Sequence, residues 1–238
     1  MKAMIFAAGL GTRFKPWTDS HPKALALVNG KSLLQRNVEY LQRYGITQLV
    51  VNVHHFADQV VEEIKRTNGW GSRILISDER DELLETGGGL LRAKPLFDAG
   101  QRFLTCNADI LTDLDISRLV AFHAQQLPLI TVSVMQRTSS RYLLFDADNR
   151  LCGWRNAATG AERIAVARSA YLPKAYSCVA VFEYEVFSLI GRTGKFSLID
   201  LYLDLAAGHR ILGYDHSGDR LADVGKPDSV AVAESLFP

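Results

Sequence analysis

Cysteine is scarce in this chain of 238 residues, which contains three, at Cys106, Cys152 and Cys178. Their number is odd, their spacing is wide, and each lies in an apolar segment. A disulfide framework uses paired cysteines and a zinc site uses closely spaced ones, so neither fits this set. We therefore expect three buried free thiols.

Long apolar runs and an excess of charge are also missing. No apolar run approaches the roughly 20 residues that a helix needs to cross a bilayer, and the amino terminus does not resemble a cleavable signal. The formal net charge is +1, so no basic surface for a polyanion stands out. Hydrophobic residues make up 47% of the chain, which excludes disorder. We expect a cytoplasmic protein, monomer or homodimer, that binds neither nucleic acid nor a membrane.

Two common nucleotide-binding motifs are absent as well. The first loop reads Gly9-Leu10-Gly11-Thr12-Arg13-Phe14, and Phe14 stands where a dinucleotide-binding loop needs a third glycine. No Gly-Lys-Ser or Gly-Lys-Thr follows, as a P-loop requires. A nucleotide-binding site, if there is one, must be of another kind.

The first loop nevertheless has the composition of an anion-binding site. Gly9 and Gly11 follow a buried strand over residues 1–8 and let the backbone turn with its N–H groups facing an anion. The glycines alone would fit a plain turn equally well. Arg13 and Lys23, however, bring a forked cation and a compact one to the same place. Together these features indicate a binding site for a nucleoside triphosphate.

Strand and helix patterns alternate up to about residue 110. Apolar runs at 49–53, 73–77 and 103–106 are separated by helical periodicities at 32–45 and 57–66, and Gly87-Gly88-Gly89 opens a short helix through Lys94. A further helical pattern covers residues 116–123. Such alternation predicts a largely parallel sheet with helices on both faces and ligands at the carboxyl ends of the strands.

The pattern changes in the second half. Strands are predicted at 129–134, 177–182 and 211–214, a hairpin at 142–152, a helix capped by Ser197, and a helix after residue 227. Residues 153–175 give no clear pattern. No linker divides the chain, so we expect one domain over residues 1–238, with a nucleotide-binding half to about residue 110 and an acceptor-binding half over about 111–238.

Two aspartates follow buried strands and are candidates for a metal site. Asp109 and Asp223 place hard carboxylate oxygens where Mg²⁺ could be held while substrate phosphates fill its other positions. Aspartates at such places also cap helices and turns, which is what we expect of Asp113 and Asp115. Alternatively, Asp113-x-Asp115 matches a metal-binding pattern of glycosyltransferases.

These segments together resemble the sugar-phosphate nucleotidyltransferases. Gly9-Leu10-Gly11-Thr12-Arg13-Phe14, with Pro22-Lys23 after it, is similar to the Gly-x-Gly-Thr-Arg-Leu and Pro-Lys-Pro of that family. Asn107-Ala108-Asp109 is similar to its Asn-Gly-Asp, and the segment from Leu221 to Pro227 to its Trp-x-Asp-Val-Gly-Thr-Pro. The resemblance implies a three-layer, Rossmann-like (GT-A-like) α/β fold with a mostly parallel mixed sheet and a small β-rich acceptor-binding part.

The resemblance also implies an activity: Mg²⁺-dependent transfer of a nucleotidyl group from a nucleoside triphosphate to a sugar 1-phosphate, releasing pyrophosphate. In it, Asp109 and Asp223 would bind Mg²⁺, and Arg13 and Lys23 would act on the phosphates as catalytic residues. The other expected nucleotide contacts are Ala7, Ala8, Gly9, Gly11, Thr12, Glu85, Thr86, Gly87, Gly88 and Asn107.

One loop points to a subclass. Leu84-Glu85-Thr86-Gly87-Gly88-Gly89 is most similar to the N-acetylmuramic acid 1-phosphate uridylyltransferases of cell-wall recycling, which predicts UTP and that sugar phosphate as substrates. GTP with mannose 1-phosphate, and dTTP or UTP with glucose 1-phosphate, remain alternatives. We also expect the glycine amides to approach the base or ribose, with Glu85 accepting a hydrogen bond.

The acceptor side departs from the family. The family's mid-chain Glu-Lys-Pro is missing, and Gly153-Trp154-Arg155-Asn156 stands there instead. Arg155, Arg168 or Lys174 could supply the phosphate-binding cation, with surface charge as the alternative for each. Two other classes stay open: a nicotinamide or flavin oxidoreductase, and a regulatory homologue that binds nucleotide without turnover.

Overall fold

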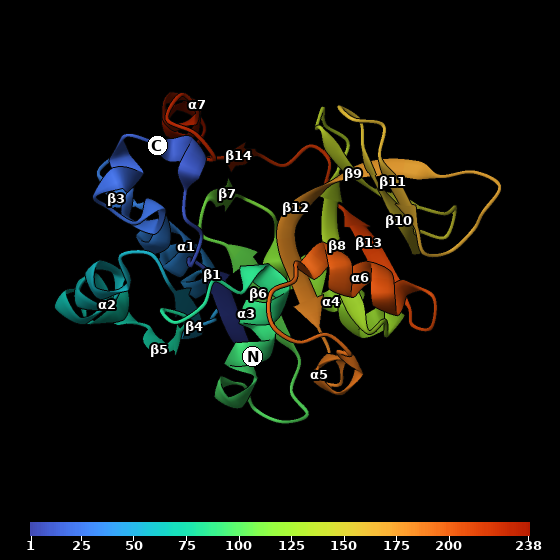
Figure 1. Cartoon of the computed structure of the whole chain (residues 1–238), viewed down its shortest axis with the longest axis horizontal. Coiled ribbons are helices and arrows are strands. Elements are labelled where there is room, and N and C mark those ends of the chain that lie inside the picture. The colour runs from blue at the N-terminus through green and yellow to red at the C-terminus, as the bar shows by residue number, and fades with distance from the viewer.

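A ten-stranded mixed sheet forms the centre of the computed structural model, which describes all 238 residues (Figure 1). Its strand order is β11-β10-β9-β12-β6-β1-β4-β5, and β8 pairs with both β12 and β13. The strands are β1 (Lys2–Phe6), β4 (Gln48–Val53), β5 (Arg73–Asp78), β6 (Phe103–Asn107), β8 (Ile130–Met135), β9 (Arg141–Phe145), β10 (Leu151–Asn156), β11 (Glu162–Ile164), β12 (Leu172–Phe182) and β13 (Ile211–Asp215).

Helices cover both faces of this sheet. They are α1 (Leu33–Gln42), α2 (Ala57–Arg66), α3 (Glu85–Ala93), α4 (Ile116–Gln126), α5 (Val186–Leu189), α6 (Leu198–Ala206) and α7 (Ser229–Leu236). Alternate residues of β1 point to opposite faces: Met4 joins a core with α3 and α6, and Ile5 joins a core with α1, α2 and α4. The expected three-layer α/β fold is confirmed.

The strands β1, β4, β5 and β6 are parallel, whereas β12 runs antiparallel to β6. The mostly parallel sheet expected up to residue 110 is therefore confirmed, as is the β9–β10 hairpin. Residues 153–175, which gave no pattern, contain the end of β10, all of β11 and the start of β12. Strand β11 is exposed throughout, and Pro173 and Lys174 interrupt the start of β12, so no alternation marks these strands.

Four short strands outside the main sheet, which form two pairs, were not expected. Strand β7 (Ile110–Thr112) pairs antiparallel with β14 (Leu221–Asp223). From β14 the chain crosses to α7, which packs beside β2 (Leu27–Val28), the partner of β3 (Lys31–Ser32) in a small hairpin (Figure 1). The carboxyl-terminal segment thus returns to the amino-terminal part of the molecule.

Helix caps follow the sequence with one exception. Ser32 and Ser197 cap α1 and α6, and Asp115 caps α4 by accepting a hydrogen bond from the Arg118 amide. The cap prediction for Asp113 was wrong. Its carboxylate instead accepts from both the backbone N–H and the Nε of Arg220, each at 2.7 Å, which occupies it and leaves no Asp-x-Asp metal pair.

The glycine run differs from expectation too. The predicted short helix is present, but α3 begins at Glu85, two residues before Gly87, so the three glycines lie inside the helix, and all three are buried. They let α3 pack closely: a Cβ on Gly88 would lie 2.2 Å from the Gly194 carbonyl oxygen, and one on Gly87 would lie 2.4 Å from the Phe196 ring. Tertiary packing therefore outweighs the low helix propensity of glycine here.

Replacing Gly88 with alanine should destabilise the fold by at least about 2 kcal/mol, because the new methyl group meets a backbone oxygen that cannot rotate away. Chemical denaturation of both proteins measures the difference in free energy of unfolding. The matched control is Gly208→Ala, where nothing lies within 4 Å, and its stability should be unchanged or higher by up to about 1 kcal/mol. Equal stability of the two variants would contradict this role of Gly88.

The three cysteines are free thiols, and Cys106 and Cys152 are buried as expected, whereas Cys178 is half-buried. None of the helices is both long enough and apolar enough to span a membrane.

Candidate active site

A cavity of about 330 Å³ opens at the carboxyl ends of β1, β4, β5 and β6. This is the edge at which parallel α/β sheets bind ligands. The cavity is lined by Phe6, Ala7, Ala8, Gly9, Lys23, Ala24, Asn52, Glu79, Leu83, Glu85, Thr86, Asn107, Ala108 and Asp109. Six of the ten residues expected to contact the nucleotide line this cavity, namely Ala7, Ala8, Gly9, Glu85, Thr86 and Asn107, whereas Gly11, Thr12, Gly87 and Gly88 do not.

The first loop is held in a fixed shape. Gly11 has a φ of 61°, and a Cβ there would lie 2.7 Å from Cγ2 of Thr18. The Thr18 hydroxyl donates to the Gly11 carbonyl at 2.9 Å, and the Ala7 amide donates to Oδ1 of Asn52 at 2.7 Å. Gly11 is therefore needed for the turn itself, while Ala7, Ala8 and Gly9 form the wall of the cavity.

Lys23 and Asp109 form an ion pair at the mouth of the cavity. The Lys23 ammonium lies 2.5 Å from Oδ2 of Asp109, and their side chains are 12% and 29% exposed. The ammonium also lies 5.8 Å from the centre of the Phe14 ring. The pair fixes a cation beside a carboxylate that could bind a metal, so an incoming phosphate would meet both.

Asp223 is brought to the same place by the β7–β14 pairing. It lies opposite Ile110, and the next residue, Val224, donates its amide to the Asp109 carbonyl at 2.9 Å. Asp223, the last residue of β14, therefore lies beside Asp109, the residue that precedes β7. Two carboxylates fit Mg²⁺, because Mg²⁺ takes few protein ligands and fills its remaining positions with water and substrate phosphates.

Arg13 lies beside Asp223 rather than in the cavity wall. A Cβ on Gly225 would lie 3.0 Å from Nη2 of Arg13 and 2.8 Å from Oδ1 of Asp223, so Gly225 leaves the space between the two side chains open. Arg13 is exposed and has no ion pair. Each expected catalytic cation thus lies beside one of the two aspartates, Lys23 at Asp109 and Arg13 at Asp223.

Two lining residues, Asn52 and Glu79, were missed by the sequence interpretation. Glu79 is fully buried, its Oε1 accepts from Nδ2 of Asn52 at 2.8 Å, and its Oε2 has no partner. Burial raises the pKa of the Glu79 carboxyl above its ordinary value. Both residues follow the rule that polar side chains at strand ends form the site. Glu79 was missed because it lies in the charged stretch 78–82, which resembles a solvent-exposed loop in the sequence.

The helix α3 segment contributes less than expected. Glu85, at a φ of 60°, and Thr86 line the cavity. The amides of Gly87 and Gly88, however, donate to the Phe196 carbonyl at 2.9 and 3.1 Å, so they cannot face a base or ribose as predicted. The helix packing described above is the reason.

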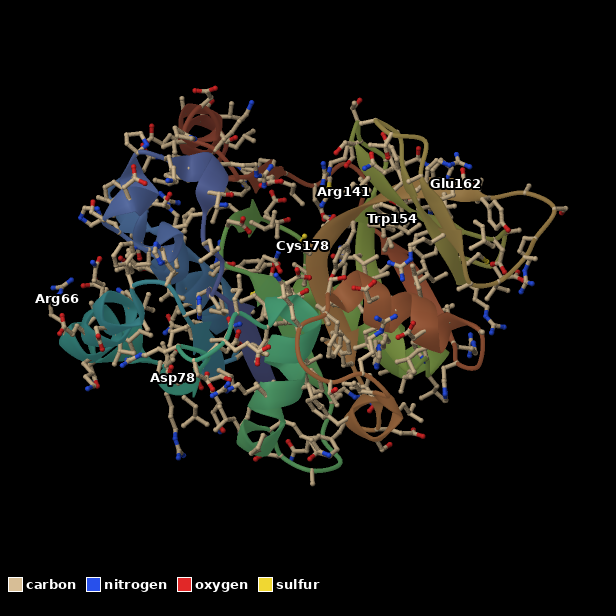
Figure 2. The ribbon with its side chains drawn as sticks, viewed as in Figure 1. Arg66, Asp78, Arg141, Trp154, Glu162 and Cys178 are labelled. Atoms are coloured by element: carbon tan, nitrogen blue, oxygen red, sulfur yellow. The ribbon has the colours of Figure 1, made fainter.

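The three cations considered for the acceptor phosphate are all ion-paired. Arg155 pairs with Glu162, Arg168 with Asp146 at 3.0 Å, and Lys174 with Asp215 at 3.0 Å. Figure 2 shows Trp154 and Glu162 in the β-rich part, away from Cys178 on β12 at the centre of the molecule. These cations stabilise the β-rich part instead.

Known proteins are similar to this chain in sequence and in fold. The nucleotidyl transferase family model matches residues 2–148. An N-acetylmuramate alpha-1-phosphate uridylyltransferase from Caulobacter vibrioides is 34% identical over 236 residues, covering 98% of this chain and 95% of that protein. A mannose-1-phosphate guanyltransferase beta-B from Xenopus laevis is 28% identical over 63% of this chain and 42% of its own length.

Among solved structures, a putative glucose-1-phosphate thymidylyltransferase from Bacillus anthracis, crystallised with a sucrose, superposes with a TM-score of 0.82 at 17% identity, covering 99% of this chain and 94% of its own. HddC from Yersinia pseudotuberculosis, complexed with GMP-PN, gives a TM-score of 0.79 at 21% identity, covering 100% of this chain and 99% of its own. These two show the fold.

Fold, site and relatives define an enzyme of the sugar-1-phosphate nucleotidyltransferase class. More specifically, since its model matches more than half of the chain, the protein belongs to the nucleotidyl transferase family. The family uses nucleoside triphosphates and sugar phosphates as substrates, which contradicts the alternative of a nicotinamide or flavin oxidoreductase.

Proposed function

We propose that this enzyme transfers a uridylyl group from UTP to N-acetylmuramic acid 1-phosphate, giving the UDP-sugar and pyrophosphate, in cell-wall recycling. The observation that carries the choice of substrates is the 34% identity to the Caulobacter vibrioides uridylyltransferase over 98% of this chain. A second enzyme of that name, from Neisseria meningitidis, is 41% identical over 49% of the chain.

The site supports such a transfer without a covalent intermediate. The phosphate of a sugar 1-phosphate is mostly dianionic near neutral pH, its second pKa being about 6, so it needs no base to become a nucleophile. One of its oxygens attacks the α-phosphorus, and pyrophosphate leaves in line. Lys23 offsets negative charge near the α-phosphate, and Arg13 binds the departing phosphates; positioning and charge carry the catalysis.

Asp109 and Asp223 are the residues that would hold Mg²⁺. When bound there, the ion would supply charge neutralisation on the phosphates, as metals do in phosphoryl transfer. The pairing of β7 with β14, which puts Asp223 opposite the residue after Asp109, supports this assignment.

The position of Glu79 favours a nucleotide whose base carries an imide N–H. Its free Oε2 is a buried acceptor in the cavity wall, and the N3–H of uracil is a donor that would satisfy it. Cytosine presents an acceptor at that position, which the carboxylate would repel. Thymine carries the same N3–H and guanine carries suitable donors as well, so the same observation also fits dTTP with glucose 1-phosphate and GTP with mannose 1-phosphate.

Replacing Glu79 with leucine should raise the KM for UTP at least about tenfold, because a hydrogen bond to a charged group is lost. Glu82→Leu, an exposed residue of the same loop, is the control and should leave the KM unchanged. An unchanged KM in Glu79→Leu would remove Glu79 from base recognition.

Glu79→Gln tests the charge separately through stability. Because the folded protein binds the Glu79 proton more tightly than the unfolded chain, wild-type stability falls as pH rises above the ordinary value of 4.5. Gln carries no such proton, so the Tm difference, variant minus wild type, should increase from pH 5 to pH 8. A difference that does not change with pH would show that the carboxyl has an ordinary pKa.

The proposed function is tested by pyrophosphate release with Mg²⁺, using UTP, GTP, dTTP, CTP and ATP singly against N-acetylmuramic acid, mannose and glucose 1-phosphates. We expect one strong pair, UTP with N-acetylmuramic acid 1-phosphate. A strong reaction of GTP with mannose 1-phosphate would establish that substrate pair instead.

A further inference from the structure

The acceptor phosphate still lacks a cation in this site, because the three cations considered above are paired with carboxylates. Among the cations of the β-rich half, Arg137 differs from these. It forms no ion pair, it is half-buried, and it follows β8 directly in the chain. Its Nη2 donates to the Tyr176 carbonyl at 3.2 Å, and its buried Nε has no partner.

Strand register places Arg137 at the active-site edge of the sheet. Strand β12 lies between β6 and β8 and runs antiparallel to both. On one side Val179 faces Cys106, and on the other Tyr176 faces Val134. Strands β6 and β8 therefore end at the same edge, and the chain continues from β6 to Asp109 and from β8 to Arg137.

Cys178, on β12, lies between the ends of β6 and β8. It has a φ of 58° at the irregularity of β12, between the paired residues Tyr176 and Ala180. Burial raises the pKa of its thiol, the charges of Asp109 and Asp223 raise it further, and the charge of Arg137 lowers it. The two aspartates and Arg137 are thus all close enough to Cys178 for their charges to act on it.

The contacts of Arg137 leave most of its guanidinium unused. Of five N–H donors, one is bound to a backbone oxygen, and no carboxylate offsets the charge. A half-buried cation without a counter-charge is unfavourable unless a ligand supplies the anion. A phosphate whose oxygens reach the aspartate pair would meet this guanidinium in the forked geometry that arginine offers.

We propose that Arg137 binds the phosphate of the sugar 1-phosphate acceptor and takes the place of the absent mid-chain lysine. The proposal rests on the proposed function for the identity of the acceptor. Lys23 and Arg13 then bind the nucleoside triphosphate, and Arg137 binds the phosphate of the acceptor.

The test compares wild type, Arg137→Met, Arg137→Lys and the control Arg155→Met, whose arginine is paired with Glu162 in the β-rich part. Calorimetric titration gives the Kd for N-acetylmuramic acid 1-phosphate, and initial rates give the KM for each substrate. In Arg137→Met we expect the acceptor Kd and KM to rise about tenfold or more, with the KM for UTP within twofold of wild type. The acceptor Kd and KM of Arg137→Lys should lie between those of wild type and Arg137→Met, and those of Arg155→Met should equal those of wild type.

Stability separates this role from a structural one. The Tm of Arg137→Met should equal or exceed that of wild type, because an uncompensated charge is removed. A lower Tm with unchanged acceptor Kd would overturn the proposal. N-acetylglucosamine 1-phosphate, which lacks the carboxylate of the muramic sugar, should lose affinity by the same factor; a loss confined to the muramic sugar would assign Arg137 to that carboxylate and also overturn the proposal.

The two proposals fail separately. If wild type releases no pyrophosphate with any substrate pair, the proposed function fails, while the calorimetric comparison still decides the role of Arg137. If wild type is active and the acceptor Kd is the same in Arg137→Met, the Arg137 assignment alone is wrong.

Discussion

Replacing Asp109 with asparagine is expected to lower nucleotidyl transfer by at least about 10³-fold, which corresponds to several kcal/mol of transition-state stabilisation. The substitution keeps the volume of the side chain and removes the charge that pairs with Lys23 and, in our proposal, binds Mg²⁺. Initial-rate kinetics at saturating substrate measure the loss. The fold should remain intact, because the side chain is partly exposed at the mouth of the cavity and its loss opens no void in the core.

Asp115→Asn is the matched control for this experiment. It makes the same chemical change six residues later, and asparagine caps α4 as well as aspartate does. Its activity and its Tm should both equal those of wild type. Wild-type activity in Asp109→Asn would remove Asp109 from the metal site and from the reaction.

Replacing Lys23 with methionine should lower kcat by about 10²–10³-fold, the loss typical of removing one group that stabilises developing charge. Methionine preserves most of the buried stem, so the change isolates the ammonium that lies 2.5 Å from Asp109. Rates at saturating UTP and acceptor separate this effect from weaker binding.

The control here is Lys15→Met, since Lys15 belongs to the same loop and its side chain is 63% exposed in a surface pair with Asp19. Surface pairs of this kind contribute little, so its rate should be unchanged. If Lys23→Met raised only the KM for UTP and left kcat intact, Lys23 would serve binding rather than the chemical step.

The sequence predicted well the features that are local. The turn at Gly11, the caps by Ser32 and Ser197, and the aspartates at strand ends depend on a few neighbouring residues. The short helix at the glycine run was predicted, but the packing of Gly87 and Gly88 was not, because it depends on segment 194–197, more than 100 residues away. A glycine run signals a turn in isolation, and only the tertiary structure turns it into a packed helix.

The electrostatic roles of single residues could not be predicted. Lys174 and Arg137 are both cations near strand ends in the sequence. Lys174 forms an ion pair with Asp215, whereas Arg137 donates only to a backbone carbonyl and forms no ion pair. Ion pairing of this kind depends on contacts between segments far apart in the chain. Glu79 was missed for the same reason, because its burial depends on the close approach of Gly89 on α3.

The most direct test of the account is a competition in one vessel. The enzyme with Mg²⁺ is given equal concentrations of UTP, GTP, dTTP, CTP and ATP together with N-acetylmuramic acid, mannose and glucose 1-phosphates, and mass spectrometry identifies the nucleotide sugars formed. We predict UDP-N-acetylmuramic acid as the dominant product. A different dominant nucleotide sugar would contradict the proposed substrates, and the absence of any product from protein that still binds UTP would contradict the proposed transfer itself.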